Sequence, residues 1–454
     1  MKKERFLSLF LIFVLALPLA APVRAASGID VDAVAALLVD ENTGEVLYEK
    51  NSRERNYPAS ITKVMTALLT LEAVDAGQLR LDQEITAGEE ATQLPSGAST
   101  VGIKVGETLT VNELLYCLLI PSANEAGNIL AEAVSGSVSA FVARMNARAQ
   151  ELGCEGTHFA NPHGLHEDDH YTTAWDIYLI TREALTHKEF TDVVGSKAHT
   201  VPETNLSKPR ELHSTNYLIS TWRTGWPGYF YKYAFGVKTG YTPEAGYCLA
   251  AAAERDGRKL ITVLLGAERV TLDDGTVETR SFSETIRLFD HGFDDFKQME
   301  LLTPDEFICE VPVELSGEAN YVVVHPAEGL TRMVPAELEL ENLTRTISLS
   351  DERVDAPVAE GDELGTITVS YGDTVYGTVP LLALNDVSAS WLLTKQRDVK
   401  DFLAQPWVKL AAIGVAALAA LVVVLRAVSL SRAKRYHGRR GGSGYRGYRG
   451  RGKR

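Results

Sequence analysis

The stretch Tyr57-Pro58-Ala59-Ser60-Ile61-Thr62-Lys63 decides what the first half of this 454-residue chain can form. Apolar residues at helical spacing continue through Val64–Ala73, so the pattern predicts a helix that begins just after Pro58, because proline suits a first helical turn. Ser60 and Lys63 are three residues apart and therefore lie on one face of that helix. Ser60 is close to the helix N-terminus, where free N–H groups and the helix dipole favour developing negative charge. This arrangement suits a serine nucleophile with a lysine base.

A second motif, Ser122-Ala123-Asn124, follows Pro121 between predicted helices at 112–120 and 125–134. Ser122 can pass a proton to a leaving group, although a serine after a proline is equally a common helix cap. Asn124 has both a donor and an acceptor, and can hold a substrate amide or Lys63.

A third motif, Lys238-Thr239-Gly240, is expected on an edge strand of a sheet. Lys238 is the candidate cation that, together with burial, lowers the pKa of Lys63 until Lys63 can accept a proton. Lys238 and Thr239 can bind a terminal carboxylate, and Gly240 lets a ligand approach the backbone. The N–H groups of Tyr241 and Ser60 are candidates for an oxyanion hole.

The regions around these motifs predict an α+β domain with a helical cluster and a sheet, over residues 26–295. A hairpin is expected at residues 33–48, and a pair of strands at 246–252 and 259–266. Further helices are expected at 138–152 and 283–293. Residues 299–385 then predict a small all-β domain, because short β-branched runs separated by turn residues recur at 307–315, 321–325, 343–349, 365–370 and 375–381.

Both ends of the chain carry membrane signals. Residues 1–25 are typical of a secretory signal peptide: a basic start, an apolar run over Phe6–Leu17, and small residues before a cleavage site at Ala26. The run is short for an uncleaved anchor. Near the other end, 386–407 predicts a helical stalk, 408–428 a transmembrane helix and 429–454 a basic tail. The alternative for this helix is that it lies on the membrane surface.

Charge predicts the orientation of this helix. From Arg426 onward there are 11 Lys/Arg and no Asp or Glu, so the tail is expected in the cytoplasm and the catalytic domain outside the cell, on a single-pass protein of the cell membrane. Residues 26–425 contain 30 Lys/Arg and 59 Asp/Glu. This acidic excess argues against a nucleic-acid partner. No C-x-x-C pair supports a metal site, and no cofactor is expected. Cys117 and Cys248 are expected to be small buried core residues.

With these motifs in this order, the chain resembles the serine-type D-alanyl-D-alanine carboxypeptidases, which are low-molecular-mass penicillin-binding proteins. The strings Asn161-Pro162-His163-Gly164-Leu165, His170-Tyr171-Thr172-Thr173-Ala174 and Ala245-Gly246-Tyr247 add to the resemblance. It implies a β-lactamase/transpeptidase-like catalytic domain and a following β domain. It also implies that Ser60 is acylated by the acyl-D-Ala carbonyl of a peptidoglycan pentapeptide, that the last D-Ala leaves, and that water releases the shortened peptide. β-Lactam antibiotics are then expected to acylate the same serine.

Some positions depart from the family pattern. Glu125 stands where an aspartate is usual, and little effect is expected. Relatives place an arginine before the last catalytic-domain helix to bind the substrate carboxylate; this position holds Ser281, with Arg280 one step earlier. Either Arg280 takes the role through a local shift or the role is lost. His163 is assigned to a structural loop, because Lys63 already supplies a base.

Two rival functions remain open from the sequence. A class A β-lactamase shares the three motifs but needs a deacylating glutamate with Asn four residues later, and no glutamate between Glu125 and Lys238 has one. A non-catalytic wall-binding receptor would keep the scaffold, but the intact residues of the three motifs argue against decay of an active site.

Overall fold

The computed structural model describes residues 28–222 and 228–437, so the predicted signal peptide and the end of the basic tail lie outside the described residues. The chain divides into two compact units. The first runs to Thr303 and also takes in Gly329–Thr346 and Thr368–Thr378; the second comprises Pro304–Glu328, Ile347–Ile367 and the chain from Val379 onward. The domain boundaries expected at 295, 299 and 385 stay predictions.

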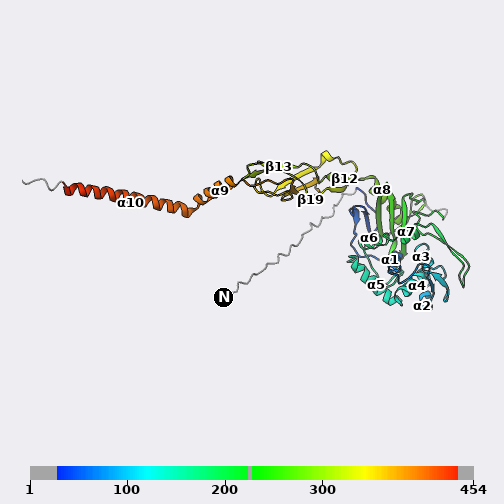
Figure 1. The fold of residues 1–454 in the computed structure, drawn as a ribbon. Helices are drawn as coiled ribbons and strands as arrows, with labels where there is room; N and C mark the ends of the chain where they lie inside the picture. Colours follow the sequence, from blue (N-terminus) through cyan, green and yellow to red (C-terminus); the bar gives the residue numbers. More distant parts are fainter. Residues whose placement is uncertain (1–27, 223–227, 438–454) are drawn as a thin grey trace, which may run out of the picture. The chain divides into compact units, whose positions relative to one another are not determined.

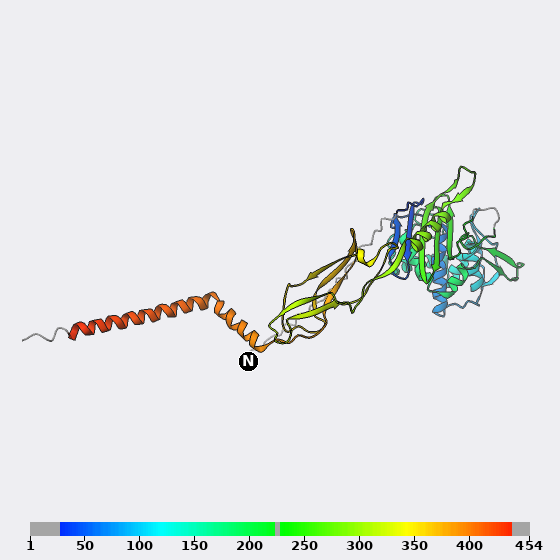
Figure 2. The same ribbon diagram turned by 90° about the horizontal axis from the view of Figure 1, so that it is seen from above.

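A five-stranded antiparallel sheet forms the centre of the first unit (Figures 1 and 2). Its order is β2-β1-β9-β8-β7, with β1 (Ala35–Asp40), β2 (Val46–Lys50), β7 (Ala234–Thr242), β8 (Gly246–Arg255) and β9 (Arg258–Ala267). The predicted hairpin is β1 with β2, and the expected edge strand is β7. Asp256 and Gly257 join β8 to β9 with φ of 53° and 81°, the left-handed backbone that a tight hairpin turn requires.

Alternate residues of these strands enter two different cores, because successive side chains of a strand point to opposite faces. Leu37 and Val263 belong to the larger core, and Leu38 and Leu264 to the second. Helix α8 (Arg280–Asp294) supplies Phe282, Leu288, Phe289 and Phe293 to the second core. The predicted antiparallel sheet therefore has a hydrophobic layer on each face.

The larger core is shared with the helical cluster seen beside the sheet in Figure 1. Its helical elements are η1 (Ala59–Thr62), α1 (Lys63–Asp75), α2 (Glu89–Thr92), α3 (Val111–Leu119), α4 (Asn124–Ser135), α5 (Val138–Glu151), α6 (Ala174–Ala184) and α7 (Lys188–Val194). The predicted helices correspond to α1, α3, α4, α5 and α8, whereas α6 and α7 were not predicted. Thr110, Ser137 and Thr173 cap α3, α5 and α6 by accepting a backbone N–H, which explains where these helices begin. The α+β architecture is confirmed.

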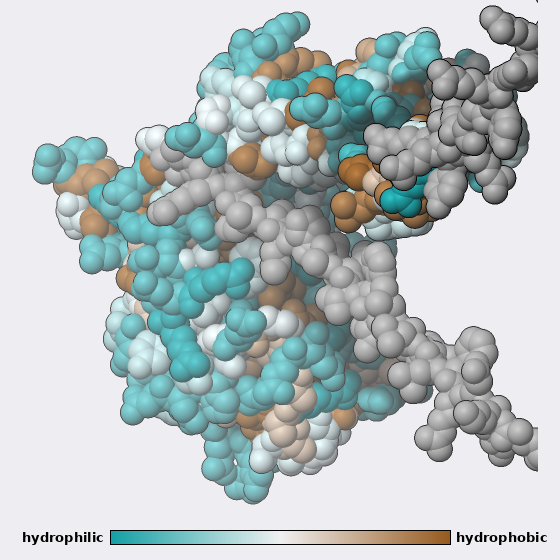
Figure 3. Space-filling model, turned by 90° about the vertical axis from the view of Figure 1, so that its left-hand side faces the viewer, coloured by the Kyte–Doolittle hydropathy of each residue, from teal (hydrophilic) through white to brown (hydrophobic). Residues whose placement is uncertain are grey.

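Three two-stranded sheets complete this part of the chain: β3 (Glu84–Thr86) with β4 (Thr108–Thr110), β5 (Ala198–Val201) with β6 (Arg210–His213), and β10 (Arg269–Thr271) with β11 (Val277–Thr279). Figure 3 shows a mostly hydrophilic face of the molecule. This agrees with the excess of acidic residues in the body of the chain.

The C-terminal part is all-β, as expected. A six-stranded sheet has the order β16-β18-β19-β14-β13-β17, and β12 pairs with β15. The strands are β12 (Phe296–Leu302), β13 (Cys309–Glu314), β14 (Tyr321–Pro326), β15 (Leu330–Pro335), β16 (Thr344–Leu349), β17 (Val354–Asp355), β18 (Glu363–Tyr371) and β19 (Thr374–Ala383), with the turn η2 (Leu340–Asn342). The five predicted runs match β13, β14, β16, β18 and β19. No pattern predicts β12, because Lys297, Gln298 and Glu300 interrupt its apolar residues.

Two helices end the described chain, α9 (Trp391–Ala404) in the predicted stalk and α10 (Pro406–His437). Pro406 starts α10, a position where its missing N–H is not needed. Within α10, Pro406–Arg432 is 27 residues long; its most apolar window of 18 residues has a mean hydropathy of 2.6, and none of that window is buried. At about 1.5 Å per residue this segment exceeds the roughly 30 Å hydrocarbon core of a bilayer. It is therefore long and apolar enough to cross a membrane.

Candidate active site

Ser60 and Lys63 meet at the junction between η1 and α1. The amine Nζ of Lys63 lies 2.9 Å from Ser60 Oγ, as the three-residue spacing predicts. The turn begins at Ala59, whose φ of 47° is unusual for a residue with a side chain. Lys63 is completely buried, so its amine is held against the serine without competition from bulk water.

Two carbonyl oxygens complete the surroundings of the Lys63 amine. It donates to Asn124 Oδ1 at 2.6 Å and to the backbone oxygen of His163 at 2.9 Å. Burial places the pKa of Lys63 well below its usual value, and the positive charge of Lys238 lowers it further, while Glu125 acts in the opposite direction. These are the conditions under which a lysine is a neutral base near neutral pH.

The Ser122–Asn124 segment connects α3 to α4. Asn124 is the first residue of α4, and Ala123 occupies the cap position without a side-chain hydrogen bond. The alternative that Ser122 caps this helix is therefore wrong. Ser122 is buried with a φ of 71°, and its Oγ has no hydrogen-bond partner among the described residues. A buried hydroxyl without a partner is uncommon and suits a group that works with a substrate.

Strand β7 brings Lys238 and Thr239 close to the site formed by Ser60 and Lys63. Lys238 is 1% exposed, donates to the backbone oxygen of Thr239 at 2.9 Å, and has a pKa lowered by burial to about 7. The hydroxyl of Thr239 is 2.6 Å from that of Thr215. Tyr241 is half exposed and its ring lies 4.5 Å from that of Tyr247.

Gly240 has a structural role in addition to the ligand approach expected for it. A Cβ at this position would lie 3.0 Å from Pro58 O, 3.0 Å from Ser60 N and 3.1 Å from Ala59 Cβ. The backbone that approaches Gly240 is therefore the segment that carries the nucleophile. Gly240 lets β7 pack directly beside Ser60, which brings the first and third motifs together.

The family follows from the sequence match over this whole region. Residues 22–269 match the family model of the D-alanyl-D-alanine carboxypeptidases. The chain belongs to this family. Residues 296–389 match the model of the C-terminal domain of penicillin-binding protein 5. The predicted D-alanyl-D-alanine carboxypeptidase function, that of a serine-type hydrolase, is confirmed, and so is the predicted penicillin-binding-protein fold.

Several individual carboxypeptidases are similar to the chain over most of its length. The D-alanyl-D-alanine carboxypeptidase DacF of Bacillus subtilis is 33% identical over 80% of this chain and 88% of its own length. DacC of Escherichia coli is 31% identical over 79% and 84%. Among solved structures, penicillin-binding protein 5 of Haemophilus influenzae has a TM-score of 0.59 at 26% identity, covering 80% of this chain and 100% of the other.

The carboxypeptidase site also depends on a buried histidine whose role the sequence does not reveal. Ala160 N–H donates to His170 Nδ1 at 3.0 Å, so Nε2 carries the hydrogen and donates to Thr62 Oγ1 at 2.8 Å. Thr62 in turn donates to Ala59 O. Burial lowers the pKa of His170 to about 4, so a neutral imidazole maintains the turn that presents Ser60. The only sequence signal is the string at 170–174, which indicates the family and no role.

Two more positioning residues are absent from the three motifs. Glu125 is buried, and its Oε1 accepts hydrogen bonds from Thr100 Oγ1, Val101 N and Gly102 N at 2.6–3.1 Å. Thr215 supports Thr239 as described above. Glu125 directly follows Asn124, but its contacts with residues 100–102 and the contact of Thr215 with Thr239 are set by the tertiary fold, so no sequence spacing predicts them.

Neither the imidazole ring of His163 nor the guanidinium of Arg280 is assigned an acid–base role. The pKa of His163 is lowered to about 3 by burial and by Lys63, and its backbone oxygen, not its ring, contacts the base. Arg280 forms an ion pair with Asp32. It lines a hollow with Lys50 and Glu268 that contains no residue of the three motifs. A role for Arg280 at the substrate carboxylate stays a hypothesis.

All four cysteines are free thiols, and Cys117, Cys154 and Cys248 are buried. Burial raises the pKa of Cys117 and of Cys248 to about 12. Both therefore behave as small core residues, as expected.

Proposed function

We propose that this chain removes the terminal D-alanine from peptidoglycan pentapeptide stems through an acyl-enzyme on Ser60, with Lys63 as the base. The three hydrogen-bond partners of the Lys63 amine are the main support for this proposal. A neutral amine has two N–H groups and one lone pair. Asn124 Oδ1 and His163 O can only accept, so they take both N–H groups. The lone pair is then left for the Ser60 hydroxyl.

Acylation proceeds from that arrangement. Lys63 takes the Ser60 proton as Oγ attacks the carbonyl carbon of the acyl D-alanine, and the N–H groups of Ser60 and Tyr241 stabilise the oxyanion. Ser122 passes the proton to the amine of the departing D-alanine, which breaks the amide bond. Its lack of a partner among the described residues supports this role. Water then attacks the ester carbonyl while Lys63 takes one of its protons; the bond between the acyl carbon and Ser60 Oγ breaks, and Lys63 gives that proton to Ser60 Oγ as the shortened peptide leaves.

Substrate binding is assigned to Asn124, Lys238, Thr239, Gly240 and Tyr241. A carboxylate next to Lys238 would favour its ammonium form, which neutralises the buried charge of both groups. Among the described residues, Lys238 donates one hydrogen bond, to the Thr239 backbone, so its remaining N–H groups suit a terminal carboxylate. A D-Ala-D-Ala ester or amide without a free carboxylate should be cleaved more slowly.

The β-lactamase alternative is disfavoured by the same geometry. Among the described residues no Asp or Glu side chain hydrogen-bonds with Ser60, Lys63 or Ser122. No glutamate between Glu125 and Lys238 has the asparagine four residues later that a class A β-lactamase needs, which disfavours the same alternative. Penicillin is expected to remain on Ser60 as a long-lived adduct.

For localisation, we propose a single-pass membrane protein with the active site outside the cell and the C-terminal tail in the cytoplasm. The apolar segment Pro406–Arg432 supports the span, and the 11 basic residues from Arg426 onward support the orientation. The peptidoglycan substrate lies on the same side of the membrane as the catalytic domain in this arrangement.

The deciding experiment measures D-alanine release from a pentapeptide by the purified chain and by Ser60→Ala, with Ser137→Ala as a matched serine control. Intact mass after penicillin treatment should show one adduct on the Ser60 peptide, and none in Ser60→Ala. Lys63→Ala should lose at least ~10³-fold in acylation rate, as when a base that acts with its nucleophile is removed. An adduct without any D-alanine release would favour a wall-binding receptor, and an adduct of equal yield in Ser60→Ala would end the proposal.

A further inference from the structure

The hydroxyl of Thr239 has a partner outside the three motifs. Its Oγ1 lies 2.6 Å from Thr215 Oγ1, and either hydroxyl can be the donor. Thr215 follows β6, and its backbone N–H donates to Ile120 O at 3.2 Å, while its Oγ1 lies 3.4 Å from the same oxygen. Ile120 directly follows α3 and precedes Ser122 by two residues. Thr215 therefore joins the segment that leads to the second motif with the strand that carries the third.

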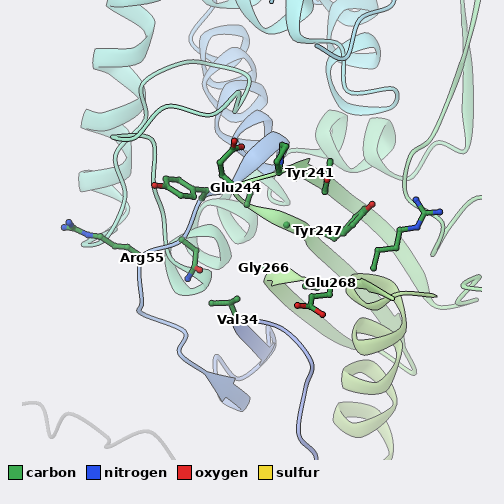
Figure 4. Close-up of a pocket in the computed structure, with 14 residues that line it drawn as sticks. Val34, Arg55, Tyr241, Glu244, Tyr247, Gly266 and Glu268 are labelled. Carbon is green, nitrogen blue, oxygen red and sulfur yellow. The ribbon is translucent and has the colours of Figure 1, made fainter. Parts of the chain in front are cut away.

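This pair of hydroxyls is distinct from the hollow at the end of β7. Figure 4 shows that hollow, which has a volume of about 760 Å³ and includes Tyr241, the residue after the third motif. Neither Thr215 nor Thr239 is among the described residues that line it. In the proposed function the terminal carboxylate of the substrate lies at Lys238 and Thr239. The hydroxyl pair, and not the hollow, is therefore the feature beside that carboxylate.

The number of hydrogens on the two hydroxyls limits what Thr239 can offer to a ligand. Each threonine hydroxyl has one hydrogen to donate and two lone pairs. If Thr239 donates to Thr215, then Thr215 can give its own hydrogen to Ile120 O, and Thr239 presents only a lone pair to a ligand. If Thr215 donates to Thr239, the hydrogen of Thr239 is available to the ligand. A carboxylate can only accept hydrogen bonds, so it is compatible with the second arrangement alone.

The second arrangement requires little rearrangement. The distance of 3.4 Å from Thr215 Oγ1 to Ile120 O exceeds the ~2.5–3.0 Å of ordinary O–H···O bonds, so Thr215 loses little when its hydrogen turns to Thr239. The backbone N–H of Thr215 donates to Ile120 O in either arrangement. Both threonines are half-buried, and hydrogen bonds in sequence polarise one another in such surroundings. Thr215 can therefore strengthen a bond from Thr239 to a charged ligand.

We propose that Thr215 is a positioning residue that selects substrates ending in a free carboxylate, because its hydroxyl donates to Thr239 and directs the Thr239 hydrogen to the anion. This inference rests on the proposed function and adds to it a determinant outside the three motifs. The charge of Lys238 attracts a carboxylate from any direction, whereas a hydrogen bond from Thr239 is directional. A C-terminal amide has a neutral oxygen and gains less from the same donor.

The test compares Nα,Nε-diacetyl-lysyl-D-Ala-D-Ala with its C-terminal amide, using the full-length protein in detergent. Thr215→Ser and Thr215→Ala both lack the methyl group and differ only in the hydroxyl, so the serine variant is the matched control. Thr215→Ala should lose roughly three- to tenfold in kcat/KM for the free acid, the equivalent of about one hydrogen bond, and should keep the kcat/KM for the amide. Most of the loss should be a higher KM. Thr215→Ser should keep the wild-type ratio of acid to amide.

Two further variants complete the test. The Thr86 hydroxyl lies 3.0 Å from that of Thr108, between the exposed strands β3 and β4. Thr86→Ala thus removes a hydroxyl from a similar pair and should leave the ratio unchanged. Thr215→Cys, whose thiol is a weak donor, should lower the ratio and replaces Thr215→Ala if the alanine variant does not fold. An equal loss for acid and amide, or a loss in Thr215→Ser as large as that in Thr215→Ala, overturns the proposal.

A binding measurement separates this inference from the proposed function. Both peptides compete with a fluorescent penicillin for Ser60, and this competition reports binding without D-alanine release. A preference for the acid in the wild type that falls in Thr215→Ala and persists in Thr215→Ser supports the inference. If no D-alanine is released at the same time, only the carboxypeptidase reaction is contradicted. Equal competition by acid and amide in the wild type, or a preference for the acid that is unchanged in Thr215→Ala, overturns the role of Thr215.

Discussion

Replacing Gly240 by alanine should slow acylation of Ser60 while leaving the fold intact. The added Cβ would lie 3.0 Å from Pro58 O and from Ser60 N, and both are backbone atoms that cannot rotate away. Reaching an ordinary contact of about 3.4 Å requires a displacement of about 0.4 Å. Because a ~1 Å misplacement of reacting groups can reduce a rate ~10²-fold, we expect roughly a tenfold lower acylation rate. Overpacking of ~1–3 kcal/mol should accompany it.

The assay is the rate of Ser60 acylation by a fluorescent penicillin at neutral pH, measured beside thermal unfolding. For a domain of this size, the overpacking corresponds to a melting temperature lower by roughly 2–12 °C. Gly228→Ala is the matched control, because no atom lies within 4 Å of its Cβ position. Acylation of Gly240→Ala at the wild-type rate would refute the reasoning that Gly240 sets the position of the nucleophile.

Three further outcomes are expected. Glu125→Gln removes a negative charge that raises the pKa of Lys63, so the acid limb of the acylation pH profile should move to lower pH; a limb that stays in place would contradict this electrostatic role. The folded pKa of His170, about 4, lies below the ordinary 6.5, so the unfolded chain takes up the proton first. The contribution of His170 to stability is complete above pH 6.5 and should fall by up to about 3 kcal/mol toward pH 4. Urea unfolding should show a shallower fall for His170→Gln, and an identical pH dependence would exclude the histidine as its source. Carbonate washing should leave the full chain in the membrane pellet while truncation after Asp386 releases it, and an external protease that removes a tag at Arg454 from intact protoplasts would contradict the orientation.

Local patterns are sufficient for the parts of the site that lie within one element. The three-residue spacing of Ser60 and Lys63 predicts their contact, since a helix places such residues on one face. The apolar runs around Gly246 predict β8 and β9, and hence an edge position for β7. The partner of Lys63 at Asn124 was one of two options that the chemistry of an amide allowed, and the structure shows that contact.

Contacts between distant elements are not encoded in any spacing. Gly240 faces Pro58 and Ser60, which precede it by about 180 residues, and its expected role toward a ligand was therefore incomplete. His170 acts on Thr62 across 108 residues. Strand β12 was not predicted because its polar residues weaken the alternation of apolar and polar residues by which a strand is assigned. Sequence patterns thus identify the reacting groups, whereas the fold determines which residues keep them in place.

At Ser122, the backbone conformation lowers stability, whereas the side-chain hydroxyl is needed for activity. Its φ of 71° lies in the left-handed region, which is unfavourable for serine by ~1–2 kcal/mol and nearly free for glycine. A glycine here would relax the connection between α3 and α4, yet it would remove the one hydroxyl of this segment that is free to transfer a proton. Selection for thermal stability alone should therefore favour Ser122→Gly, and selection for D-alanine release should restore the serine.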